Sequence, residues 1–504
     1  MRRTPDSPRP SIDAHIRAAW STLRRSAVDP AAYTDVKAGG SPTLYLPHRM
    51  AVPAEASRLA REHGVAVRHL PRPILRLGDV HPGELPGPGL LYLPHPYVVP
   101  GGMFNEMYGW DSYFIVRGLL EDGQVDAARA MVDNWLFEIE HYGSILNANR
   151  TYYLTRPQPP FLTSAVCAVH DQIQDRGWLA MAFEYAERDL AMWTAAPFLA
   201  GTTGLSRYYD VGEGPIAETA QHERYYEQVA QWVATHPVSS ENLGGPAAES
   251  TPSALPVFEM RGAPHSPSPV VLGADYYKGD RAMRASGFDV SFRFGPFSGA
   301  THHYAPVCLN ALLYKAESDL ARFAALLGRD PRPFESAAHR RAAAMRMHLW
   351  SEEAGTFFDY DFTRQQRSSY AFATMAWPLW AGLATPREAS RVANCLGALE
   401  REHGLSMSHV RSGAQWDEPY GWAPPHLLAV EGLLRYGEQD MARRLARKFN
   451  RTIRRGYERD GTIREKYDVT TGGSDCRIAM GYADNVIGFG WTNGVYRVFE
   501  SLLD

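Results

Sequence analysis

Residues 100–113 read PGGMFNEMYGWDSY, and residues 415–424 read QWDEPYGWAP. Each stretch places a tryptophan beside a carboxylate, among glycine and proline turns. Sugar sites use this mixture, because aromatic faces stack on the C–H edges of a sugar ring and carboxylates accept hydrogen bonds from its hydroxyls. The pair therefore indicates a carbohydrate cleft to which distant parts of the chain contribute.

From residue 111 onward the chain is a succession of helix-length segments with apolar residues at helical spacing. Little strand pattern lies between them, which argues against the βαβ alternation of an α/β fold. An all-α toroid fits this pattern, and we find no fixed-period consensus of the kind that a solenoid shows. The predicted helices span 110–120, 125–142, 177–195, 217–235, 307–327, 333–350, 368–383, 386–403, 425–436, 439–457 and 490–503.

The first ninety residues differ from the rest. They contain one amphipathic helical segment, 11–26, and a strand-like piece, 43–46, among many prolines; another strand-like piece follows at 90–93. We predict that residues 1–90 form an irregular, partly β N-terminal extension or cap, and that 91–504 form one catalytic domain. Long irregular stretches at 238–276 and 468–484 are predicted to be lids, because loops of this length in a compact domain are usually functional or disordered.

Composition excludes several classes of function. The 504 residues carry a net charge of −4 and are 45% hydrophobic, so nucleic-acid or anionic-membrane binding is not indicated. The four cysteines show no CxxC spacing, which speaks against a zinc site or a disulfide framework and fits a reducing, cytoplasmic compartment. No apolar segment suited to a secretory signal or a membrane span is present. We predict no metal and no cofactor, and nothing in the sequence speaks to the oligomeric state.

The two opening stretches resemble the two signature segments of trehalases, glycoside hydrolase family 37. Similar segments occur between and after them, in the family's order: NANRTYYLTRPQPP at 147–160, ASGFDVS at 285–291, IREKYDV at 463–469 and GFGWTNGV at 488–495. The resemblance covers roughly residues 90–504. It implies an (α/α)6 barrel and a metal-independent, inverting α-glycoside hydrolase of the trehalase type.

Hydrolysis of a glycosidic bond needs one carboxylic acid and a second carboxyl as base or nucleophile. Asp289 follows Phe288, and burial against aromatic rings would raise its pKa and keep it protonated. Glu465 lies between Arg464 and Lys466, which would keep it ionised. The resemblance makes Asp289 the general acid and Glu465 the general base. From the residues alone, a helix cap or turn aspartate is the favoured interpretation of Asp289, and an exposed ion pair is the usual one for Glu465.

The resemblance also assigns the sugar contacts. Arg156 suits this role, because its guanidinium can give forked hydrogen bonds. For a lone tryptophan, core packing is the alternative interpretation. The predicted substrate-binding residues are Phe104, Tyr108, Trp110, Asp111, Asn147, Arg156, Gln158, Glu218, Gly287, Gln415, Trp416, Asp417, Trp422 and Trp491.

Three positions depart from the trehalase pattern. Met103 and Ile216 stand where the family has arginine, and Ile487 stands where it has an acidic residue. An apolar side chain cannot pair with a hydroxyl, and a lost charged partner costs roughly 1.5–3 kcal/mol. We therefore expect an altered leaving-group subsite and weak trehalose turnover beside that of a better α-glucoside.

Three kinds of function remain open at this point. The first is hydrolysis of a small α-linked disaccharide or α-glucoside, with α,α-trehalose as the best single substrate and glucosylglycerate, cleaved by related family 63 enzymes, as an alternative. The second is a non-catalytic sugar-binding protein, which would bind without turnover. The third is a polysaccharide lyase, which would need a His or Tyr base and a basic cleft; the net charge and the missing arginines speak against it.

Overall fold

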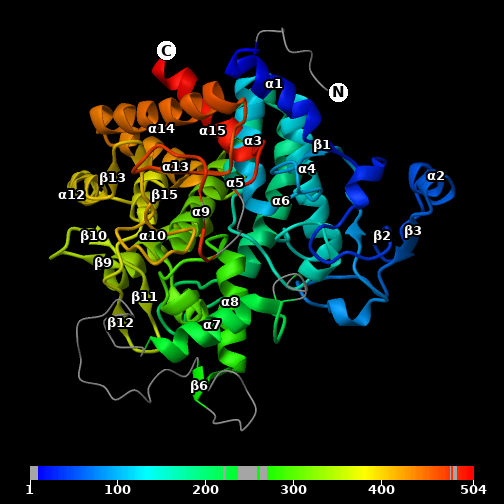
Figure 1. Ribbon diagram of the computed structural model, residues 1–504, viewed down its shortest axis with the longest axis horizontal. Helices are drawn as coiled ribbons and strands as arrows, with labels where there is room; N and C mark the ends of the chain where they lie inside the picture. The colour runs from blue at the N-terminus through cyan, green and yellow to red at the C-terminus, as the bar shows by residue number, and fades with distance from the viewer. Residues whose placement is uncertain are drawn as a thin grey trace.

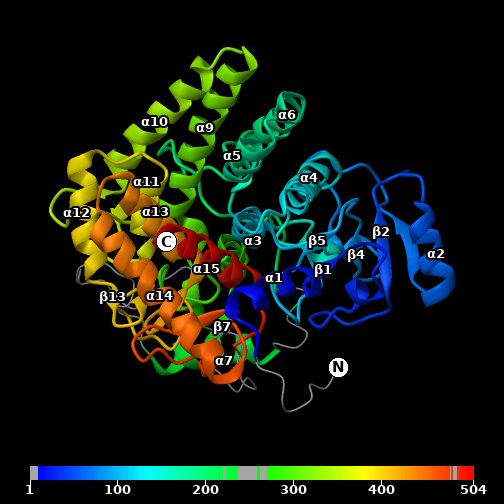
Figure 2. The same cartoon turned by 90° about the horizontal axis from the view of Figure 1, so that it is seen from above.

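The computed structural model describes residues 9–216, 218, 223–236, 258–260, 270–476, 478–480 and 485–504. About 51% of the chain is helical, so the predicted helical class is confirmed. Figures 1 and 2 show the helices gathered into one body, from which a blue N-terminal lobe projects. In the part of the chain that is described, no helix is both long enough and apolar enough to span a membrane.

Helices that follow one another in sequence pack in pairs. The paired helices are α3 (Gly109–Glu121) with α4 (Val125–Tyr142), α5 (Leu162–Ile173) with α6 (Arg176–Trp193), α9 (Val307–Leu327) with α10 (Arg332–His348), and α13 (Ala423–Arg435) with α14 (Gln439–Asp460). The last helix, α15 (Gly490–Leu503), packs against α3, so the two ends of the helical region meet. Figure 2 looks down on these pairs.

Local sequence signals set where helices begin. The Asp175 carboxylate accepts a hydrogen bond from Trp178 N (2.9 Å) and caps α6. Thr385 and Glu388 form a reciprocal capping box at the start of α12 (Pro386–Gly397). Such caps pair the first N–H groups of a helix, which have no partner within it. Burial of apolar side chains supplies the remaining stability of the helices, because buried side chains from α1 to α15 form one continuous hydrophobic core.

The N-terminal lobe has a small core of its own. Its parallel sheet has the order β3-β2-β4, where β2 is Thr43–Leu46, β3 is Ala66–His69 and β4 is Leu90–Leu91. Helix α2 (Ala54–His63) belongs to the same lobe. Contacts between the N-terminal residues and the helical body include the pairing of β1 (Arg24–Arg25) with β5 (Tyr97–Val98). They also include a hydrogen bond that Trp20 Nε1, from α1 (Ile12–Thr22), donates to Asp122 (2.8 Å).

Several predicted elements differ from the structure. Where a helix over 368–383 was predicted, only η8 (Ala373–Ala376) and α11 (Trp377–Trp380) form, because the backbone before them is extended and Ala373 N donates to Met407 O (2.8 Å). Helices α5 and α8 (Ala274–Ser286) were not predicted. Helix α7 spans Glu223–Thr235, and most of the predicted lid 238–276 lies outside the described residues.

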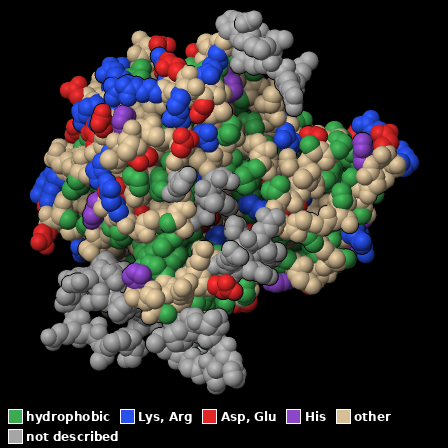
Figure 3. Space-filling model, in the orientation of Figure 1, with side chains coloured by type: hydrophobic (Ala, Val, Ile, Leu, Met, Phe, Trp, Pro, Cys, Tyr) green, Lys and Arg blue, Asp and Glu red, His purple; other side chains and the backbone are tan. Residues whose placement is uncertain are grey.

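Charge on the surface is mixed rather than of one sign. On the face drawn in Figure 3, basic side chains gather over α14 and are interspersed with acidic ones. Arg444 and Lys448 of α14 pair with one carboxylate, since Arg444 Nε and Lys448 Nζ lie 2.8 and 2.7 Å from Glu400.

Candidate active site

A cavity lies among the motif segments, with about 730 Å3 of empty space when the open solvent at its mouth is counted. Its wall includes both predicted catalytic carboxyls and every predicted substrate-binding residue except Asp417. The predicted residues that line it are Phe104, Tyr108, Trp110, Asp111, Asn147, Arg156, Gln158, Glu218, Gly287, Asp289, Gln415, Trp416, Trp422, Glu465 and Trp491. Segments far apart in the sequence therefore meet around one space.

The start of α3 forms one wall. Trp110 N donates to the side-chain oxygen of Gln158 (2.8 Å), which joins the first motif to the Arg156 segment. Asp111 lies in the first turn of α3 and is buried. Burial, and then the nearby charges of Glu465 and Asp289, raise the pKa of Asp111 well above its ordinary range. Asp111 thus shares this cavity with three other carboxyl groups, those of Glu218, Asp289 and Glu465.

The segment that carries Asp289 is tightly held. Gly287 ends α8 with a left-handed φ of 79°, and a Cβ there would lie 2.7 Å from the Trp110 ring. The Gln415 amide donates to the Asp289 carbonyl, and Trp416 N donates to Val290 O (3.1 Å). The second motif therefore fixes the backbone around Asp289.

The Asp289 side chain is placed to keep its proton to a higher pH than an ordinary aspartate does. Burial raises its pKa to about 6, against the opposing charges of Arg284 and Lys37. Arg284 Nη1 lies 3.6 Å from Asp289 Oδ2, and the side chain is 23% exposed. An acid with this pKa can donate a proton near neutral pH.

Glu465 lies directly before β16 (Lys466–Asp468), which pairs with β15 (Tyr420–Trp422) and brings it beside the second motif. Its backbone N–H donates to Val486 O (3.0 Å), and Trp491 Nε1 donates to its carbonyl (3.2 Å). The carboxylate accepts a hydrogen bond from the buried Lys466 ammonium. The predicted second cation, Arg464, instead donates to Asn485 O (3.1 Å).

A buried charged network supports Arg156. Its Nε donates to Asp210 (2.9 Å) and its Nη1 to Glu218, while Arg281 Nη1 also donates to Asp210 (3.0 Å). The arginines hold the pKa values of Asp210 and Glu218 below their ordinary range despite burial. Arg156 Nη2, Glu218 Oε2 and Gln415 Oε1 are buried and make no hydrogen bond to the described residues. These atoms suit the hydroxyls of a sugar.

Tryptophans form the apolar part of the wall. Trp416 and Trp422 stack with centroids 3.8 Å apart and an interplanar angle of 5°. Trp110 lies 5.9 Å from Trp416, and Trp491 lies edge-on to Trp422 at 5.8 Å. The four rings line the cavity as well as packing together, so core packing alone does not describe them.

A profile of the family described as Trehalase matches residues 84–503. The chain belongs to the trehalase family. It is 39% identical over 445 residues to the cytosolic neutral trehalase of Emericella nidulans, and 36% identical over 440 residues to that of Saccharomyces cerevisiae. These matches cover 80% of this chain, but the chain spans only 57% and 56% of those proteins.

A solved structure, neutral trehalase Nth1 from Saccharomyces cerevisiae, superposes with a TM-score of 0.80 at 31% identity, covering 98% of this chain and 94% of that one. A family 63 mannosylglycerate hydrolase from Thermus thermophilus, in complex with glucose, gives a TM-score of 0.53 at 20% identity, over 80% and 95% of the two chains. The latter likeness concerns the fold alone.

One predicted contact of the trehalase pattern does not reach the cavity. Asp417 is fully buried behind it, among the residues that the structure describes. Its carboxylate accepts hydrogen bonds from Phe292 N (3.0 Å), Tyr370 Oη (2.6 Å), Ser408 Oγ (3.0 Å) and Ser412 Oγ (2.6 Å). In the structure it therefore links the loops that carry these four donors, and its contact with a sugar stays a prediction.

The three departures from the family pattern do not lie together. Ile216 lines the cavity, whereas Met103 and Ile487 are 37% and 49% exposed and do not belong to the wall that the described residues form. The structure therefore places only Ile216 at the cavity, and the altered leaving-group subsite stays a prediction.

Two cations at the cavity were not predicted. Lys37 and Arg284 both line it. Lys37 precedes the helical region in the sequence, and its Nζ lies 2.7 Å from Tyr108 Oη and 3.3 Å from Tyr153 Oη. Arg284 lies five residues before Asp289, on the last turn of α8, so its position on that helix could have indicated it once the helix was known. Nothing in the local sequence marks Lys37.

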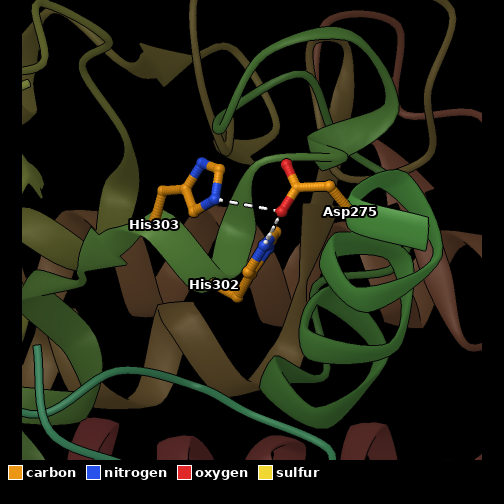
Figure 4. A group of neighbouring side chains, drawn as sticks. All are labelled: Asp275, His302 and His303. Carbon is orange, nitrogen blue, oxygen red and sulfur yellow. Dashed lines mark hydrogen bonds and ion pairs between the residues drawn. The ribbon is translucent and has the colours of Figure 1, made fainter. Parts of the chain in front are cut away.

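Among the described residues, one group of side chains could hold a metal ion: Asp275, His302 and His303. Figure 4 shows this cluster. Its members are not part of the cavity wall described above, so a metal held there would not line the candidate active site.

Proposed function

We propose that this cavity hydrolyses α,α-trehalose to glucose with inversion at the attacked carbon. Asp289 donates its proton to the glycosidic oxygen as the C1–O bond breaks, and Glu465 takes a proton from the water that forms the new C1–O bond. The observation that carries the proposal is that both carboxyls line one tryptophan-walled cavity, with the pKa of Asp289 raised to about 6. We expect the two carboxyls to be about 6.5–9.5 Å apart, which leaves room for the water.

The rest of the wall gives the proposal its substrate. Arg156, Glu218 and Gln415 offer polar atoms that have no partner in the described protein, and they suit sugar hydroxyls. The tryptophan faces suit the C–H edges of the pyranose rings. The curated relatives at 36–39% identity are named neutral trehalases, which favours trehalose over another α-glucoside such as glucosylglycerate.

Lys37 and Arg284 supply cations at the cavity, where Ile216 stands in place of a family arginine. Lys37 is held in place because the Asp35 carboxylate accepts its backbone N–H (2.9 Å) and lies 3.8 Å from the buried Arg150. The charge of Lys37 lowers the pKa values of Asp289 and Asp111. We propose that its ammonium contacts a substrate hydroxyl and tunes the acid.

We predict that Lys37→Met lowers kcat/KM for trehalose by ~10–100-fold, the cost of one hydrogen bond to a charged group. Removal of the positive charge should raise the pKa of Asp289, so the alkaline limb of the kcat/KM profile should move to higher pH. Lys37→Arg should retain most activity, and Arg61→Met, on the exposed face of α2, should change neither quantity. An unchanged profile and efficiency in Lys37→Met would remove Lys37 from the site.

For the fold, we propose an (α/α)6 barrel over residues 91–504 with residues 1–90 as a cap that contributes Lys37. The proposal is supported by contacts that run from α3 to α5, α9, α11, α13 and α15 and back to α3. The partner helices α4, α6, α10, α12 and α14 lie outside them in Figure 2. This arrangement would leave the helix starts around the cavity.

For the setting, we propose a cytoplasmic enzyme whose partner is a small sugar. The relatives named above are described as cytosolic, and the four cysteines are free thiols. The test of the function is glucose release from trehalose, measured beside a panel of other α-linked disaccharides and glucosylglycerate. Turnover of trehalose above that of every other compound supports the proposal; binding without turnover contradicts it.

A further inference from the structure

Asp275, in the first turn of α8, meets two adjacent histidines of η7 (Thr301–His303). His302 Nε2 lies 2.8 Å and His303 Nε2 lies 3.3 Å from the same oxygen, Asp275 Oδ1. One ligand atom from each residue lies within 4.8 Å of the others. Figure 4 shows both imidazole rings turned toward the carboxylate.

This ligand set has the chemistry of a transition-metal site. Zn2+ binds imidazole nitrogen at about 2.0–2.1 Å and carboxylate oxygen at about 2.0–2.2 Å in tetrahedral geometry, so its ligand atoms lie about 3.3 Å apart. The separations from Asp275 Oδ1 therefore need to open by no more than about 0.5 Å. Two nitrogen ligands disfavour Mg2+ and Ca2+, which prefer oxygen.

Two polar atoms of the cluster are not used by the protein. Asp275 Oδ2 and His302 Nδ1 are buried and make no hydrogen bond to any residue that the structure describes. The His302 side chain is only 5% exposed, whereas those of Asp275 and His303 are 34% and 17% exposed. The cluster is therefore rigidly held on one side and open to water on the other, which allows an ion to enter and keep water ligands.

One cation lies nearby. Arg207 Nη1 donates to the backbone carbonyl of His302 (3.0 Å), and its guanidinium packs on the rings of Tyr209 and Phe362 at 4.5 and 5.7 Å. The positive charge of Arg207 weakens the attraction of the cluster for a metal ion. Its hydrogen bond goes to a backbone carbonyl, so the Asp275 carboxylate stays available to the ion.

We propose that Asp275, His302 and His303 bind one divalent transition-metal ion, with Zn2+ as the best fit, and that the ion closes the chain segment carrying Asp289. This segment leaves the cluster along α8, turns at Gly287, passes Asp289 and returns to η7. Its two arms already touch, because a Cβ on Gly279 would lie 1.6 Å from Gly299 O. An ion that joins both ends of the segment lowers the conformational entropy that the segment would gain on opening.

The ion would be structural rather than catalytic. Helix α8 runs from beside Asp275 to Ser286, and eleven residue steps along it correspond to a rise of about 16 Å. Asp275, His302 and His303 are also not among the described residues that line the cavity, so they would hold the metal outside its wall. The metal proposal therefore does not depend on the proposed hydrolysis, and it is tested by metal binding and stability instead of by activity.

The test uses the full chain, treated with a chelator and dialysed. Calorimetric titration with ZnCl2 should give one ion per chain, and a hundredfold excess over Kd should raise the thermal midpoint by about 2 °C. His303→Ala and Asp275→Asn should each abolish both effects. His339→Ala, which removes an exposed histidine of α10, should leave them unchanged.

A second measurement covers variants that fail to fold. Co2+ added to the wild-type chain should give the intense visible absorption of a tetrahedral or five-coordinate nitrogen–oxygen site, and Zn2+ should displace it. The proposal is overturned if the spectrum stays that of the hydrated ion. It is equally overturned if zinc stoichiometry in the folded Asp275→Asn/His303→Ala double variant equals that of the wild type.

Discussion

Asp289→Asn is expected to lower kcat for trehalose by ~10²–10⁴-fold, because the amide cannot protonate the leaving oxygen. Wild-type kcat/KM should fall as the pH rises above about 6, since Asp289 must be protonated to act and burial raises its pKa to about 6. The measurement is initial glucose release across pH for the two proteins. Asp330→Asn, at an exposed ion pair before α10, should retain wild-type rates.

Stability gives this prediction an independent control. The folded pKa of Asp289 lies above the ordinary value of 3.8, so its ionisation at neutral pH opposes folding. Asn removes that effect, and the thermal midpoint at pH 7 should stay the same or rise. Lost activity with an unreduced midpoint assigns the residue to the chemistry, whereas unchanged turnover removes it from the mechanism.

Glu465→Gln is expected to lower kcat to a similar degree, ~10²–10⁴-fold, because the amide cannot take a proton from water. The amide oxygen can still accept the hydrogen bond from Lys466, so the fold should be kept, and circular dichroism checks this. The matched variant Glu335→Gln, on the exposed surface of α10, should remain fully active.

Azide separates the role of base from that of acid. In Glu465→Ala, azide should attack the anomeric carbon of α-glucosyl fluoride as the C–F bond breaks, giving β-glucosyl azide. Product of the α configuration, or rescue of Asp289→Ala with the same stereochemistry, would contradict the assignment of Glu465 as the base.

The sequence predicted much of this site because its motifs are local. Trp110–Asp111, Gly287–Asp289 and Glu465 each lie in a short segment, and the family's residue pattern identifies such segments without knowledge of their spatial neighbours. Asp417 shows the limit of that approach. It lies next to Trp416, but adjacent side chains leave the backbone in different directions, and its carboxylate turns away from the cavity to pair with four donors.

What could not be predicted depends on contacts between distant segments. Lys37 lies at the cavity in a segment that Arg150 holds by donating to Thr34 O and Ala32 O (both 3.1 Å). The hydrophobic pattern of residues 30–40 does not indicate that contact. The helix expected over 368–383 failed for a related reason, since hydrogen bonding to Met407 overrides local propensity there. The presence of helices elsewhere was predictable because apolar residues of the buried face recur about every 3.6 residues.

The most direct test of the central claim is the anomeric form of the glucose that trehalose yields in the first turnovers, followed by proton NMR before mutarotation. Inverting hydrolysis by Asp289 and Glu465 predicts equal amounts of β-glucose, from the attacked ring, and α-glucose, from the departing ring. Initial release of α-glucose alone would indicate retention and contradict the assigned roles. No release from trehalose, while another α-glucoside is cleaved, would contradict the proposed substrate.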